Sequence, residues 1–156
     1  METKFSKEVP VKLGKARNGF MLAYDVKETP MEEIERQWRL GRGTAGEGAG
    51  EPDEYFIRDH RYMYNEIRIP QGQMNYGGIV NAIVRDKYGV EEMESITNNV
   101  TSVVSEFFNT LVTGGIVEAT KLLKESFKGS NTELFMEMQQ WRALAKKEAK
   151  NALNMQ

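Results

Sequence analysis

The chain has 156 residues, of which 40% are hydrophobic and 28% are charged, and its formal net charge is −2. This length and composition are those of an ordinary globular protein that can bury one real core. A nearly balanced charge creates no long-range field toward nucleic acid or an anionic membrane, so a charged partner would have to be bound by a local patch. The sequence has no cysteine, which excludes disulfides, thiolate metal ligands and cysteine nucleophiles.

The N-terminal ten residues are polar and charged and lack the apolar core of a secretion signal. No later segment approaches the roughly 20 apolar residues that cross a bilayer. We therefore expect a cytoplasmic protein without a membrane partner.

Residues 1–40 are expected to form a basic arm, a β-hairpin and a short helix. Apolar and polar residues alternate at 9–13 and again at 20–26. Between these runs lies Asn18-Gly19, a dipeptide typical of tight hairpin turns. Thr29 and Pro30 then predict the cap and the first position of a helix. That helix should end near Leu40, where a glycine-rich stretch begins.

Residues 41–52 contain five glycines and almost nothing to bury, so we expect a flexible loop. The following segment, 53–70, is rich in aromatic and β-branched residues and stops at Pro70. It is expected to form a strand that joins the N-terminal hairpin in an antiparallel sheet.

The remainder, 71–156, is expected to be helical. Apolar residues recur in steps of three and four at 79–88, 90–111 and 116–127, and glycines at 89, 114–115 and 129 separate these runs. Several β-branched residues at 100–104 leave a break or a strand there as an alternative. Ser130 and Glu133 form a capping box ahead of a closing helix over about 132–152. Its apolar face, which we expect to dock, consists of Leu134, Met138, Trp141 and Ala145.

The predicted fold class is α+β, predominantly α. A small N-terminal antiparallel sheet, made of the hairpin and one further strand, precedes a C-terminal bundle of three to four helices. We expect a single domain over 1–156.

The sequence points to no catalytic, cofactor-binding or metal-binding residue. His60 is the only histidine and follows Asp59, but neighbours on a strand point to opposite faces, so we expect a structural histidine. One histidine without cysteine cannot supply a nitrogen- or sulfur-rich zinc site. The glycines at 41–46 lack the lysine and hydroxyl residue of a phosphate-binding loop.

Two other patterns have both a structural and a chemical interpretation. Gly77-Gly78 could begin a helix that binds an anion, although two glycines alone are weak evidence. Carboxylates cluster at 53–54 and at 91–94, where a loop and a helix N-terminus respectively explain them without a cation or acid–base chemistry.

Basic residues near both ends are the candidate interaction site. They are Lys12, Lys15, Arg17, Arg142, Lys146 and Lys150. The three in the closing helix recur every four residues and form a stripe that could bind phosphates. The alternative is that they solubilise the helix and complement its dipole.

Residues 74–88, MNYGGIVNAIVRDKY, together with 138–147, MQQWRALAKK, resemble small proteins from phages and prophages of gut Bacteroidota. The resemblance covers only these two stretches and implies a virion or assembly component, located in the host cytoplasm or the virion. We accordingly expect a non-enzymatic structural protein that makes protein–protein contacts as a homo-oligomer or in a larger assembly. The alternative hypotheses are a nucleic-acid-binding or regulatory module and an enzyme with a site assembled from scattered residues.

Overall fold

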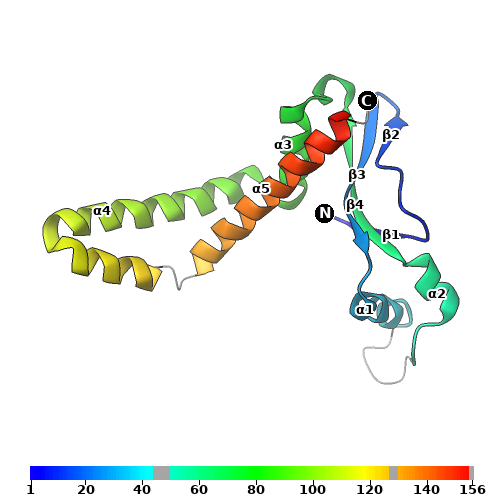
Figure 1. Ribbon diagram of the computed structural model, residues 1–156, viewed down its shortest axis with the longest axis horizontal. Coiled ribbons are helices and arrows are strands. Elements are labelled where there is room, and N and C mark those ends of the chain that lie inside the picture. Colours follow the sequence, from blue (N-terminus) through cyan, green and yellow to red (C-terminus); the bar gives the residue numbers. More distant parts are fainter. Residues whose placement is uncertain (44–49, 127–129, 155–156) are drawn as a thin grey trace. The chain divides into compact units, whose positions relative to one another are not determined.

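The computed structural model describes residues 1–43, 50–126 and 130–154, with side chains omitted at 126, 130 and 131. The chain divides into two compact units (Figure 1). The first comprises Met1–Ala82 and Glu148–Gln156, and the second comprises Ile83–Lys147. Most of the glycine-rich loop predicted at 41–52 lies outside the described residues.

The first unit contains a four-stranded antiparallel sheet. Its strands are β1 (Thr3–Ser6), β2 (Leu13–Ala16), β3 (Gly19–Glu28) and β4 (Tyr62–Pro70), in the order β1-β4-β3-β2. The predicted hairpin is confirmed as β2 and β3, and Asn18 takes a positive φ of 60° in its turn. The sheet has one strand more than predicted, because the N-terminal arm forms β1 and pairs with β4.

The sheet holds the core of this unit. Leu22, Ala23 and Tyr24 are at most 2% exposed. Because consecutive strand residues point to opposite faces, β3 must be covered on both sides. In β4, Ile67 and Ile69 are buried on one of these faces, as expected for alternation. Because three consecutive side chains of β3 are buried, this strand forms the core of the first unit.

Two short helices lie between β3 and β4; the first confirms the predicted helix with a different cap, and the second was not predicted. Helix α1 (Met31–Gly41) begins after Pro30 without a side-chain cap, and the hydroxyl of Thr29 is buried without a hydrogen bond among the described atoms. Helix α2 (Glu54–Asp59) occupies the first part of the predicted strand 53–70. The carboxylate of Asp53 accepts a hydrogen bond from the backbone N–H of Phe56 at 2.8 Å. That cap starts a helix where the β-branched and aromatic composition had suggested a strand.

The C-terminal part is helical, as predicted. After the 3₁₀ turn η2 (Gln71–Gln73) come α3 (Tyr76–Lys87), α4 (Val90–Ser126) and α5 (Ser130–Asn154). The segment 97–105 is helical, so the β-branched residues do not interrupt it. The boundary between the two units falls within α3 and again within α5.

A small apolar core stabilises the second unit. Tyr88, Ile96 and Met138 are buried, and Met93, Phe135 and Trp141 pack against them. The indole N–H of Trp141 donates a hydrogen bond to the carbonyl of Ile83 at 3.0 Å. The predicted docking face of α5 is correct for Met138, Trp141 and Ala145, but Leu134 is 41% exposed. The predicted capping box involves Ser130, whose side chain lies outside the described atoms.

We predict that Trp141→Ala lowers the free energy of unfolding by roughly 2–4 kcal/mol, because it removes a partly buried ring and leaves the space below it unfilled. Replacing exposed Lys146 and Lys150 together by Gln should change it by less than about 0.5 kcal/mol. Urea unfolding followed by circular dichroism measures both. A larger loss from the lysine pair than from Trp141 would contradict this assignment of faces.

Candidate interaction site

Helix α4 is a helical hairpin rather than one straight rod. Gly115 has φ 83° and ψ 176°, a conformation that residues with a Cβ rarely adopt. The chain doubles back there, so a first arm, residues 90–114, is followed by a return arm, residues 116–126 (Figure 1). The predicted break at Gly114-Gly115 is thereby confirmed.

An inner row of apolar side chains holds the two arms together. On the first arm it continues from Ile96 of the small core through half-buried residues spaced three or four apart, which are Val100, Val103, Phe107 and Leu111. On the return arm Ala119 is fully buried, and Leu122 and Leu123 are half-buried. This spacing places each row on one face of its helix, as helix pairing requires.

A second apolar row on the first arm is exposed. Val104, Phe108 and Val112 are 44%, 57% and 86% exposed, so exposure grows toward the turn. Their spacing of four residues aligns them along one side of the arm. Directly after the turn, Ile116 and Val117 are 71% and 77% exposed. We call these five residues the outer face of the hairpin.

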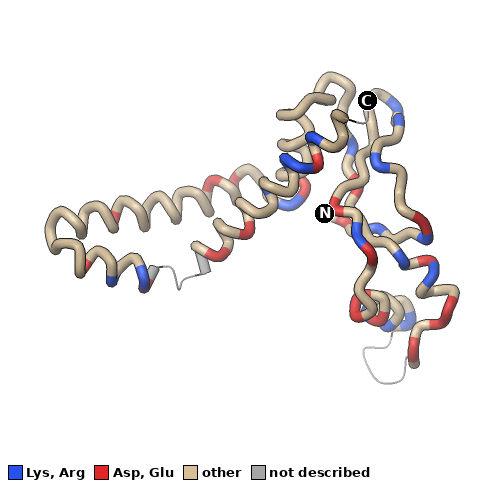
Figure 2. Tube along the Cα trace, in the orientation of Figure 1, with Lys and Arg blue, Asp and Glu red and all other residues tan. Residues whose placement is uncertain are grey.

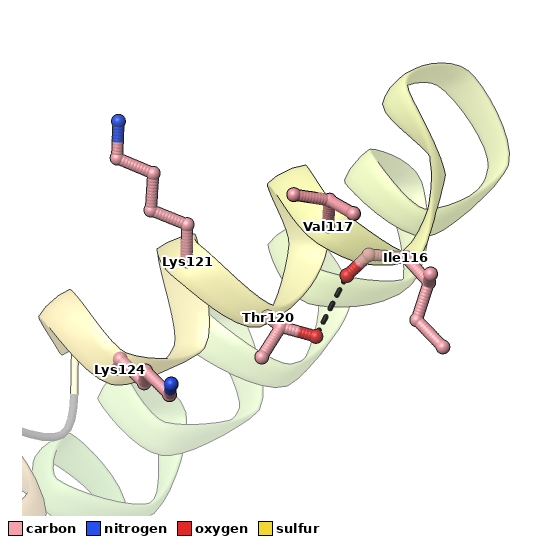
Figure 3. Close-up of a pocket in the computed structure, with 5 residues that line it drawn as sticks. All are labelled: Ile116, Val117, Thr120, Lys121 and Lys124. Carbon is pink, nitrogen blue, oxygen red and sulfur yellow. Dashed lines mark hydrogen bonds between the residues drawn. The ribbon is translucent and has the colours of Figure 1, made fainter.

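The outer face of the return arm also contains a shallow pocket. Its lining consists of Ile116, Val117, Thr120, Lys121 and Lys124 (Figure 3). Neither lysine forms an ion pair with a carboxylate of the described residues. The pocket therefore combines exposed branched aliphatic groups with two ammonium groups that form no ion pair within the described part of the chain.

The threonine hydroxyls of α4 are largely satisfied within the helix. Those of Thr97, Thr101, Thr113 and Thr120 each donate to the backbone carbonyl four residues earlier, at 2.7–2.9 Å. A hydroxyl bonded in this way needs no external partner. The hairpin can therefore be covered by apolar groups without leaving these hydroxyls unpaired.

Few charges lie on the first arm (Figure 2). Between Glu94 and Glu118 the sequence has one charged residue, Glu106. Over Val90–Glu125 the helix is long and apolar enough to cross a membrane by length and composition, with a mean hydropathy of 1.3 in its most apolar window, and none of that window is buried. No such segment was expected from the sequence, so that expectation is corrected here. The Thr, Ser and Asn residues among the apolar ones conceal this stretch from a count of consecutive apolar residues.

The predicted basic site is divided between the two units. Lys12, Lys15, Arg17 and Lys150 belong to the first unit, and Arg142 and Lys146 belong to the second. Lys15, Arg17, Lys146 and Lys150 are exposed, and Arg142 is partly buried. A basic residue can serve as a contact residue only if its charge is not already paired within the protein.

Lys12 has a partner inside the first unit. Its ammonium nitrogen lies 2.5 Å from a carboxylate oxygen of Glu148, whose side chain is 9% exposed. The same oxygen makes no aligned hydrogen bond, so the contact is an ion pair with poor hydrogen-bond geometry. Because Glu148 is buried, removing Lys12 would leave a charge uncompensated, which makes a structural role for Lys12 the better interpretation.

The residues that might have carried chemistry are engaged in local structure. The Nδ1 atom of His60 lies 2.9 Å from the carbonyl of Phe56, and its ring stacks on the Phe56 ring at 3.9 Å. His60 thus ends α2 and does not lie on a strand. No group of three or more acidic or histidine side chains within the described residues is placed to hold a metal.

The predicted anion-binding start of α3 is capped internally. The side-chain oxygen of Asn75 accepts a hydrogen bond from the backbone N–H of Gly78 at 2.9 Å. A Cβ at Gly78 would collide with the carbonyl of Gln73. Gly78 is therefore explained by a close backbone approach.

Shifted pKa values occur at exposed ion pairs. A hydrogen bond to the Glu66 carboxylate raises the pKa of Lys4 across strands β1 and β4. In α1, hydrogen bonds from Arg36 and then Gln37 lower the pKa of Glu33, and Glu33 in turn raises the pKa of Arg36. These shifts reflect surface pairing and do not mark an acid or base in a cleft.

Comparison with family models, with curated proteins and with solved structures gave no match.

We predict that Gly115→Ala destabilises the protein by about 1–3 kcal/mol, because alanine must adopt the strained conformation of the turn. Gly89→Ala is the matched control, since an added Cβ there meets nothing within 4 Å and no positive φ is required. Equilibrium unfolding in urea compares the two. Equal losses from both variants would show that Gly115 does not set the reversal.

Proposed function

We propose that this protein is a non-enzymatic structural or assembly protein that makes protein–protein contacts through the outer face of the α4 hairpin. One observation supports this proposal more than any other. The five residues of the outer face are apolar and 44–86% exposed, and they lie on both sides of the turn at Gly115. Exposed apolar side chains gathered in one element are typical of interaction surfaces.

The organisation of the hairpin supports a contact role. The inner row already supplies what the hairpin needs to pair its arms, so the outer face contributes little to folding. Because it is not needed for the fold and is unfavourable in water, its apolar character fits a surface that a partner covers. The internal hydrogen bonds of the threonines lower the cost of covering it.

The engagement of polar residues elsewhere favours a non-enzymatic role. Asp53 caps α2, His60 ends the same helix, and Glu148 pairs with Lys12. The pairing of Lys12 also weakens the alternative of a nucleic-acid-binding module, because it removes one of the six predicted contact residues.

The proposed location of the assembly is a phage particle. This part of the proposal rests on the resemblance of residues 74–88 and 138–147 to phage and prophage proteins. Of these stretches, Met138 and Trp141 belong to the small core at the hairpin base. The resemblance therefore includes two residues that pack in the same core as Ile96 of α4, the helix that forms the proposed contact surface.

We predict that the double variant Phe108→Ser, Val112→Ser remains folded but no longer enters its native assembly. Both side chains are exposed, so their loss should change the free energy of unfolding by less than about 0.5 kcal/mol. Sedimentation of the tagged protein in extracts of its native source, or in purified particles, measures incorporation.

The control variant is Asn109→Ser, which changes an exposed polar residue on the same arm. It should sediment like the wild type. If the double variant also sediments like the wild type, the outer face is not the contact surface. Salt-sensitive binding to nucleic acid that is lost when Lys146 and Lys150 are replaced would favour the alternative function.

A further inference from the structure

We propose that the end of the sheet around the β2–β3 turn binds the phosphate backbone of a nucleic acid. The cations that make this contact are Lys15, Arg17 and Arg68, and all three side chains are exposed. Arg68 comes from β4 and lies 51 residues from Arg17 along the chain. Lys12 is not part of this surface, because its charge is paired with Glu148. The inference goes beyond the proposed function, since it concerns the first unit and a second class of partner.

Carboxylates are absent from both chain segments that build this end of the sheet. Residues 9–24 and 67–85 contain no Asp or Glu, although 28% of the chain is charged and its formal net charge is −2. None of the three cations forms an ion pair with a carboxylate of the described residues. By contrast, Lys4, Lys27 and Arg36 of the same unit have carboxylate partners. The charges at this end are therefore available to an external anion.

The three cations surround the turn and do not share one face of the sheet. In the strand register Lys15 is opposite Phe20. Arg68 is opposite Met21, the next residue of β3. Because neighbouring residues of a strand point to opposite faces, Lys15 and Arg68 approach the end of the sheet from its two sides. Arg17 lies between them, in the turn that joins β2 to β3.

The side chains from both faces reach the end of the sheet. The guanidinium of Arg68 donates a hydrogen bond to the backbone carbonyl of Arg17 in the turn. Lys15 is one residue away from the last pair of the hairpin, Ala16 with Gly19. That step is about 3.3 Å along a strand, which the four-carbon stem of a lysine spans. A polyanion with one phosphate per nucleotide can therefore contact several of these charges at once.

The other side chains at this end suit a phosphate backbone better than an apolar partner. The exposed amides of Asn18, Gln71 and Gln73 lie at the turn and in the segment hydrogen-bonded to it, and amides commonly contact phosphate and sugar oxygens. Over 13–24 and 67–75, which are described throughout, no large apolar side chain is exposed. The two guanidinium groups match phosphate oxygens in a planar, two-point geometry.

The salt dependence of binding to a fluorescein-labelled DNA duplex of about 20 base pairs tests this inference, because each neutralised phosphate contributes about −0.9 to the slope of log K against log salt. Fluorescence anisotropy with the full chain measures the affinity. With three contacts the wild type should bind about 40-fold more weakly at ~200 mM than at ~50 mM salt. Lys15→Gln, Arg17→Gln leaves one contact, so its binding should be weaker at low salt and should fall only about three-fold over the same range.

The matched control is Lys27→Gln, Arg36→Gln. It also removes two exposed positive charges from the first unit, but these are paired with Asp25 and Glu33. Its affinity for the duplex and its salt slope should be those of the wild type. An equal loss in both double variants would assign the binding to net charge and overturn a site at the end of the sheet. Circular dichroism establishes that each variant is folded.

Other outcomes would also overturn the inference. One is a wild-type protein that does not bind the duplex at ~50 mM salt. Another is a Lys15→Gln, Arg17→Gln variant that binds like the wild type. Flotation with phosphatidylglycerol and phosphatidylcholine vesicles, lost in this variant while the duplex is not bound, would assign the surface to a membrane. The Phe108→Ser, Val112→Ser variant changes only the second unit and should keep its affinity for the duplex, so the two proposals can fail independently.

Discussion

The reversal at Gly115 is the constraint on which the second unit depends. Without a residue that tolerates a φ of 83°, the run from Val90 to Ser126 would continue as one helix. The inner row of the first arm would then have no return arm to cover it, and Ala119 could not be buried. The turn also leaves the apolar residues on either side of it, Val112 and Ile116, as the most solvent-exposed part of the hairpin together with Val117. A single backbone conformation thus creates both the pairing of the arms and the uncovered surface at their end.

The first unit is organised by different interactions. Its sheet has short edge strands with lysines, as Lys4 in β1 and Lys15 in β2 illustrate, and such edges resist further pairing. The pair between Lys12 and Glu148 links the segment before β2 to the last part of α5.

Several polar side chains of the described residues are engaged in local structure. Polar groups that could have acted as acids, bases or ligands serve as caps and ion pairs, and the pKa shifts follow from exposed pairs. The proposed contact role rests instead on exposed apolar side chains of the α4 hairpin. Replacing one of these exposed apolar residues by a polar residue should change the free energy of unfolding little, because the side chain is already in contact with water.

The sequence by itself determined the local structure wherever one physical signal was dominant. Asn18-Gly19 specified the turn of the hairpin, because few other dipeptides accept its positive φ. Steps of three and four specified the helices, and Gly114-Gly115 and Gly89 marked their ends. Where signals competed, local interactions changed the result. The Asp53 cap made 54–59 helical despite a strand-like composition, and the helix continued through the β-branched residues at 100–104.

Only the tertiary structure decided which apolar and charged residues were available to a partner. Periodicity places Phe107 and Phe108 in one broad apolar sector, but the position of the return arm buries one row and exposes the other. Leu134 lies at a core-like position of α5 and yet is exposed, because the core it was expected to join ends at Phe135 and Met138. Lys12 looks like a free cation in the sequence, and its partner Glu148 lies far along the chain. Whether a side chain is covered, and whether a charge is paired, depends on residues that are distant in the sequence. The spacing of residues along the chain could therefore reveal neither.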